Sequence, residues 1–133
     1  MRELKNHIVS GDQSHQLRIE VCDEPGSGGA NHAYQIDGFD TDTNPGTKDV
    51  PDAPRTYATI LFQNGAIKEA GVNGVSHEAL LAILIDRLQC FMDGPFPSAD
   101  TAVALTHCKD ALTALQKRTL ARIARGVEGT TQA

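Results

Sequence analysis

Three arginines near the end of the chain are the residues whose type and spacing most directly suggest chemistry. Arg118, Arg122 and Arg125 (the arginine triplet) stand at positions i, i+4 and i+7, so they fall on one face of a helix. Residues 101–126 carry a formal charge of +4 in a chain whose net charge is −5. Guanidinium groups that share a face repel one another unless an anion lies between them. The triplet therefore predicts a site for a small, compact anion.

The triplet also has two alternative roles that need no small anion. Basic residues in the last turn of a helix are favoured by the helix dipole, which accounts for Arg122 and Arg125 without any ligand. However, an exposed helix usually carries acids among its basic residues, and this stretch has only Asp110. A nucleic-acid-binding or transcription-regulating module would need a wider basic surface, whereas the remainder of the chain carries −9. Nucleic acid is therefore not the expected partner.

A glycine-containing turn at residues 71–76 is a second candidate for anion contact. Gly71 and Gly74 would let backbone amides approach a ligand, and Ser76 is placed to cap a helix whose N-terminal end carries about half a positive charge. Asn73 and Ser76 would add side-chain donors. The turn lacks the lysine of a nucleotide-triphosphate loop. Alone it is more often a simple strand-to-helix connection, but beside the arginine triplet it would complete a bisphosphate clamp.

An aromatic group could hold the base of a nucleotide. Phe62, with Tyr57 and Tyr34, is the candidate, because stacking on an aromatic ring contributes about 1–3 kcal/mol per base. Phe62 ends a predicted strand, where Gln63 and Asn64 could contact the edge of the base. The alternative is that Phe62 is an ordinary core residue.

Catalysis finds little support in the sequence. No serine lies in a nucleophile elbow, and no HxxH or HExxH arrangement occurs among the histidines, which are His7, His15, His32, His77 and His107. If the protein were an enzyme, His77 at the start of a helix would be its general acid or base. We expect a binding protein instead.

No metal or other cofactor is expected. The loop at residues 40–54 is rich in Asp, but it lacks the glycine and the final glutamate of an EF-hand calcium site. The three cysteines form neither a zinc pattern nor an even set for disulfides. Cys90 and Cys108 lie on apolar helical stretches and are expected to be small core residues.

The first half of the chain predicts a small antiparallel sheet. Alternation of polar and apolar residues, or β-branched and aromatic enrichment, marks four segments, residues 17–22, 32–39, 55–63 and 66–72. Asn64-Gly65 predicts a type I′ hairpin between the last two. The acidic stretch at about residues 40–54 predicts a mobile loop.

The second half predicts two antiparallel helices. Ser76 and Ser98 are expected N-caps, residues 94–97 a sharp connection and Gly126 the end of the second helix. The apolar arc of the first helix exceeds the roughly 100° that one packing partner covers, so a second copy of the chain is expected on the other side.

The predicted class is α+β: a sheet region at residues 1–74 and a helical hairpin domain at 75–133, assembled into a homo-oligomer. No segment approaches the roughly 20 apolar residues of a membrane span, and a cytosolic protein is expected.

The second half also resembles a known family. The resemblance rests on the segments 60-ILFQNG-65, 67-IKE-69, 71-GVNGV-75, 79-ALLA-82 and 85-IDRL-88, followed by 94-GPF-96, 115-LQKRT-119 and 122-RIARGVEGT-130. These segments resemble the bacteriophage anti-defence "sponge" proteins with a C-terminal helical hairpin, of the Thoeris anti-defence type and related to the anti-CBASS hairpin proteins. The resemblance covers roughly the last 75 residues; before residue 55 only the general character agrees.

The resemblance implies a function without catalysis. Such proteins sequester cyclic nucleotide immune signals in the host cytoplasm, for example glycocyclic ADP-ribose isomers made by Thoeris TIR enzymes. Some hold CBASS cyclic di- or trinucleotides in separate pockets of a hexamer. The broad apolar face of the first helix would then form the oligomer, and the arginines would meet the pyrophosphate. The implied ligand-binding residues are Phe62, Asn73, Gly74, Ser76, Arg87, Arg118, Arg122 and Arg125. We expect that each residue of the triplet can be replaced by alanine with a loss of affinity but without unfolding.

Overall fold

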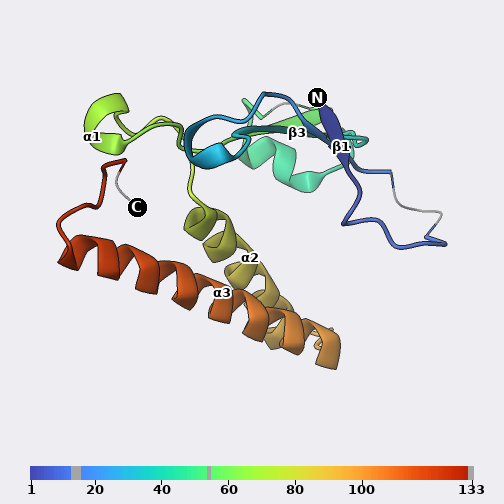
Figure 1. The fold of residues 1–133 in the computed structure, drawn as a ribbon. Coiled ribbons are helices and arrows are strands. Elements are labelled where there is room, and N and C mark those ends of the chain that lie inside the picture. The colour runs from blue at the N-terminus through green and yellow to red at the C-terminus, as the bar shows by residue number, and fades with distance from the viewer. Residues whose placement is uncertain (13–15, 54, 132–133) are drawn as a thin grey trace. The chain divides into compact units, whose positions relative to one another are not determined.

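The computed structural model describes residues 1–12, 16–53 and 55–131, and it divides into two compact units, Met1–Asn64 and Gly65–Ala133 (Figure 1). His15 and Pro54, which fall within the segments discussed from the sequence, lie outside the described residues. The first unit holds the strands and the second holds the α-helices, so the predicted α+β class is confirmed.

The first unit is a four-stranded antiparallel sheet. Its strands are β1 (Arg2–Leu4), β2 (Arg18–Val21), β3 (Ala33–Asp37) and β4 (Tyr57–Leu61), which are neighbours in that order. Three of the predicted strands are confirmed. The fourth strand is β1, which is too short to give a period-2 pattern in the sequence.

The register of the strands separates an apolar face from a polar face. Tyr34 lies opposite both Val21 and Ile60, and Val21 is only 1% exposed. These residues and their next-but-one neighbours share the apolar face, because successive side chains alternate across a strand. Arg18 and Tyr57 both lie opposite Asp37 and therefore belong to the polar face. The core of this unit is thus a thin layer on one side of the sheet.

Short 3₁₀ turns occupy the connections on either side of β3. Ser27–Gly29 (η1) follows β2, and Pro45–Asp49 (η2) lies in the acidic stretch between β3 and β4. The Asn44 side chain caps η2 by accepting a hydrogen bond from the Gly46 amide at 2.9 Å. The Thr47 hydroxyl donates to the Thr41 carbonyl at 2.8 Å, so this stretch folds back on itself locally.

The predicted return strand at residues 66–72 is wrong. A four-residue helix, α1 (Ile67–Ala70), occupies this segment. A type I′ turn requires a positive φ at both central residues, whereas Gly65 has a φ of 94° and no described non-glycine residue, Asn64 included, has a positive φ. The chain therefore leaves β4 without a hairpin, and Gly71, with a φ of 75°, ends α1.

The second unit contains the helical hairpin. Ser76 caps α2 (His77–Asp93) by accepting a hydrogen bond from the Ala79 amide at 3.1 Å. Ser98 caps α3 (Ala99–Ala124) in the same way through Thr101, also at 3.1 Å. Both predicted caps are confirmed, and Gly126, with a φ of 72°, follows the end of α3 as predicted.

The two helices pack along a seam with the spacing of a coiled coil. Residues three and four apart are at least half-buried on each helix, namely Leu81, Ile85, Leu88 and Met92 on α2 and Leu105, Cys108, Leu112 and Leu115 on α3. Cys108, expected from the sequence to be a small core residue, is half-buried at this seam. Cys90 is exposed, so the core position predicted for it is wrong.

The C-terminal end of α3 extends beyond α2. The helices have 17 and 26 residues and are joined at residues 94–98. At 1.5 Å per residue, the excess length of α3 is about 13 Å, and it lies at the end of the hairpin where α2 begins (Figure 1). The N-terminus of α2, the preceding turn and the arginine triplet therefore belong to the same end of the hairpin.

Candidate anion-binding site

The three arginines of the triplet have different environments. Arg118 and Arg125 are exposed, and among the described residues neither forms an ion pair. Arg122 is only 7% exposed. Its Nε contacts the Glu128 carboxylate at 3.1 Å, and its Nη2 donates to the carbonyls of Val127 at 3.1 Å and Thr130 at 3.2 Å. The spacing correctly predicts a shared helical face, but one member of the triplet is held by the chain itself.

Residues 126–130, the C-terminal hook, fold around the Arg122 guanidinium. Gly126 and Gly129 have φ values of 72° and 79°, a conformation that residues with side chains rarely adopt. The Val127 amide donates to the Arg122 carbonyl at 3.0 Å, and the Val127 side chain is buried. The hook thus buries an apolar side chain and supplies three oxygen acceptors to Arg122.

The turn at residues 71–76 joins α1 to α2 rather than a strand to a helix. Of its two glycines only Gly71 has a positive φ; Asn73 is exposed and Gly74 is half-buried. The Ser76 oxygen accepts the capping hydrogen bond, which leaves its hydroxyl hydrogen able to donate elsewhere. The Gly71 amide already donates to the Ile67 carbonyl at 2.9 Å, and the predicted anion contacts of this turn stay a prediction.

Arg87 lies apart from the triplet within one chain. It is on α2 about 16 Å along the helix from Ser76, at 1.5 Å per residue. Its guanidinium carbon lies 5.2 Å from the centre of the Phe91 ring, in a cation–π contact. Ile83 and Leu84 are exposed on the same side of α2, with Ile83 64% exposed. Arg87 therefore belongs to an apolar stripe of α2, and its predicted ligand contact stays a prediction.

Phe62 directly follows β4 in the first unit. Its ring meets that of Tyr34 edge to face, with centroids 5.7 Å apart and an interplanar angle of 88°. Its amide donates to the His32 carbonyl at 2.8 Å, which fixes the backbone. Tyr57 belongs to the opposite face of the sheet. Two of the three predicted aromatic residues, Tyr34 and Phe62, are therefore in contact. The Phe62 ring packs against Tyr34 and is still partly exposed at the surface.

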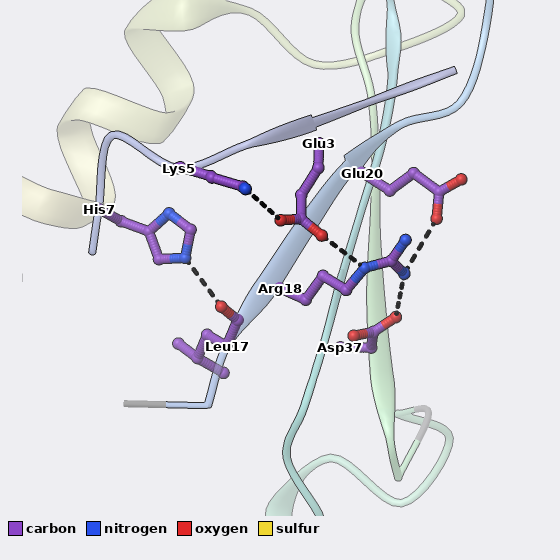
Figure 2. Close-up of polar contacts among 7 residues, drawn as sticks. All are labelled: Glu3, Lys5, His7, Leu17, Arg18, Glu20 and Asp37. Atoms are coloured by element: carbon purple, nitrogen blue, oxygen red, sulfur yellow. Dashed lines mark hydrogen bonds and ion pairs between the residues drawn. The ribbon is translucent and has the colours of Figure 1, made fainter. Parts of the chain in front are cut away.

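The polar face of the sheet carries a cluster in which carboxylates surround an arginine. Arg18 contacts the carboxylates of Glu3 at 2.8 Å, Glu20 at 3.2 Å and Asp37 at 3.6 Å, while Lys5 lies 3.9 Å from Glu3 (Figure 2). The hydrogen bond to Glu3 and the nearby Glu20 raise the pKa of Arg18 above its ordinary value. Three carboxylates already surround this guanidinium, so it is not available to an anionic ligand.

Asp23 fastens the start of β3. Its carboxylate accepts hydrogen bonds from the backbone amides of His32 at 3.0 Å and Ala33 at 3.1 Å. Burial alone would raise the pKa of this carboxyl, but the bonds from Ala33 and His32 outweigh it and lower the pKa below its ordinary value. The ionised form therefore contributes to the stability of the first unit.

We expect Asp23→Asn to destabilise the protein at pH 7 and to lose this effect in acid. A carboxyl with a lowered folded-state pKa contributes stability above its unfolded pKa, and that stability is lost as the pH falls through the folded value. The difference between wild type and Asp23→Asn should therefore shrink below about pH 4. Urea unfolding at neutral and acidic pH measures it, with the exposed Asp86→Asn as control. An equal difference at both pH values would contradict the role of the ionised carboxylate.

The described residues contain no group of three or more His, Cys, Asp or Glu side chains that could hold a metal ion. His77, the predicted acid or base of an enzymatic alternative, is the exposed first residue of α2. Within the described part of the chain, no helix has both the length and the apolarity needed to cross a membrane.

Two residues at this end of the hairpin are not singled out by the sequence pattern. Glu128 follows the helix and so lies outside its charge pattern, yet it pairs with Arg122. Lys68 falls in the predicted return strand, yet its backbone amide donates to the Gly129 carbonyl at 3.1 Å. The glycines at 126 and 129, three residues apart after a helix, are the signal in the sequence that indicates a folded hook.

The second half of the chain is similar to known proteins. Residues 55–120 match the model of the Acb2/Tad1 hairpin domain, so the matched part ends before Arg122 and the hook. Over 81 residues the chain is 46% identical to a protein of Bacillus phage SBSphiJ7 named Thoeris anti-defense 1. The match covers 61% of this chain and 57% of that relative. The predicted resemblance to the anti-defence hairpin family is confirmed.

Proposed function

Because residues 55–120 carry the Acb2/Tad1 hairpin domain, we propose that this chain is a phage anti-defence protein that sequesters a cyclic nucleotide immune signal. The signal we propose is a glycocyclic ADP-ribose isomer of the Thoeris system, bound without cleavage in the cytoplasm of the host cell. The name of the Bacillus phage relative supports the Thoeris assignment.

The observation that carries the proposal is the pair of exposed guanidiniums at the overhanging end of α3. Arg118 and Arg125 are about 10 Å apart along the helix, and among the described residues no carboxylate pairs with either of them. Charge-assisted hydrogen bonds from arginine suit the oxygens of a pyrophosphate. The turn at residues 71–76 adds Asn73, Gly74 and Ser76 at the same end of the hairpin.

A homo-oligomer, a dimer or a hexamer, is part of the proposal. On α2 the stripe of Ile83, Leu84 and Phe91 is exposed in one chain, and so are Leu120 and Ile123 at the end of α3. Such apolar side chains gain free energy when a second copy covers them. Arg87 and Phe62 remain among the ligand-binding residues that we propose for this assembly.

Calorimetric titration with glycocyclic ADP-ribose isomers tests the proposal, followed by heating of the complex and mass analysis of the released molecule. Intact ligand supports sequestration. A cleaved product would overturn it in favour of an enzyme, for which His77→Ala should abolish turnover but not binding. Tight binding of CBASS cyclic di- or trinucleotides instead would change the ligand class within the same scaffold.

We expect Arg118→Ala and Arg125→Ala each to weaken binding about tenfold to a hundredfold. Loss of one charge-assisted hydrogen bond costs about 1.5–3 kcal/mol, which corresponds to that range. Both side chains are exposed, so the melting temperature should hardly change. Unaltered affinity in both variants would show that these arginines form only a water-exposed face of the helix and do not contact the ligand.

A further inference from the structure

Helix α1 brings a further cation to the C-terminal hook. The backbone amide of Lys68 donates to the Gly129 carbonyl at 3.1 Å. The aliphatic part of its side chain lies over the same glycine, because a Cβ placed on Gly129 would be 3.4 Å from the Lys68 Cγ and 3.6 Å from its Cε. Both the backbone and the side-chain stem of Lys68 are therefore placed by residue 129.

The position of residue 129 is in turn set by Arg122. Glu128 contacts the Arg122 Nε through its carboxylate, and Thr130 accepts from Nη2 through its carbonyl, so the residues on both sides of Gly129 bind one guanidinium. Arg122 is almost fully buried in these contacts. A continuous group of hydrogen bonds thus links α3, the hook and Lys68.

The charges at this point leave Lys68 uncompensated. Glu128 is the carboxylate of the hook, and it is already paired with Arg122. Among the described residues Lys68 forms no ion pair, and its side chain is exposed. Glu69 is its neighbour in sequence, but consecutive side chains in a helix point about 100° apart. An exposed ammonium group therefore stands at the hook that directly follows Arg125.

We propose that Lys68 is a further ligand-binding residue that contacts a phosphate group of the signal together with Arg118 and Arg125. This proposal rests on the proposed function, since it assumes a ligand with phosphate groups at this end of the hairpin. The contact between Gly129 and the Lys68 stem restricts the side chain before binding, so less side-chain entropy is lost when the ammonium meets the ligand. Arg122 supports Lys68 by fixing the hook.

Titration of wild type, Lys68→Gln and Lys109→Gln with the glycocyclic ADP-ribose isomers tests this inference. Lys109→Gln is the matched control, because it removes the same charge from an exposed site in the middle of α3. We expect Lys68→Gln to weaken binding at least tenfold, Lys109→Gln to stay within twofold of wild type, and Lys68→Arg to retain most of the affinity. The melting temperatures of all variants should remain near that of wild type.

The outcomes separate the two proposals. If wild type binds and Lys68→Gln binds equally well, the role of Lys68 is overturned and the proposed function stands. If Lys109→Gln weakens binding as much as Lys68→Gln, the effect is one of net charge and the specific contact is overturned. If wild type itself binds none of the isomers, the proposed function is overturned.

Discussion

Arg122→Ala is expected to lower the free energy of unfolding by about 3 kcal/mol. The substitution removes the partner of the Glu128 carboxylate and the donor to the carbonyls of Val127 and Thr130. Removing one member of a buried ion pair typically costs about 3–5 kcal/mol, and the lower end applies because the Glu128 side chain is 39% exposed. Urea unfolding followed by circular dichroism measures the loss.

The remaining two arginines of the triplet provide the control for this prediction. Arg118→Ala and Arg125→Ala remove the same type of side chain from exposed positions of the same helical end, and they should change stability by only about 0.5 kcal/mol. The loss of stability in Glu128→Gln should be smaller than in Arg122→Ala and larger than in Arg118→Ala. The amide oxygen of glutamine still accepts a hydrogen bond from Arg122, but it carries no charge. If Arg122→Ala unfolds like Arg118→Ala, the hook is not formed in solution.

This result would correct the expectation from sequence that every arginine of the triplet can be replaced without a loss of stability. Helical periodicity places the three side chains on one face, and it does so correctly. Whether a side chain on that face is buried depends on the hook, which approaches from beyond the end of the helix. Charge counting within the helix does not include Glu128, so it cannot assign Arg122 a structural partner.

The fold shows the same division between local and non-local information. Ser76 and Ser98 are predictable as caps because an N-cap needs only its own side chain and an amide three residues on, and both are confirmed. The hairpin predicted at Asn64-Gly65 is wrong although its sequence signal is strong. Strand β4 pairs with β3, and the residues after Gly65 form α1. The contact of Lys68 with Gly129 joins residues about sixty positions apart, and no local pattern predicts it.

The hairpin seam should be more sensitive to truncation than any exposed position of the same helix. Leu105 is 7% exposed at the α2–α3 seam, and Leu105→Ala should lower the free energy of unfolding by about 3 kcal/mol, through lost burial and the cavity that remains. Thermal unfolding by calorimetry measures this loss. A cost below about 1 kcal/mol would contradict the packing of α2 against α3.

Leu120→Ala is the matched variant, since it truncates the same side chain on the same helix where one chain leaves it 64% exposed. For a chain that stays alone, this substitution should cost almost nothing. In the proposed homo-oligomer a second copy covers such apolar positions, so Leu120→Ala should reduce the mass measured by light scattering and make the melting temperature depend more steeply on protein concentration. Leu105→Ala, whose lost contacts lie within one chain, should destabilise the protein at every concentration. Unchanged mass and melting temperature in Leu120→Ala would show that the end of α3 faces solvent or ligand, because only a covering copy turns an exposed leucine into a stabilising one.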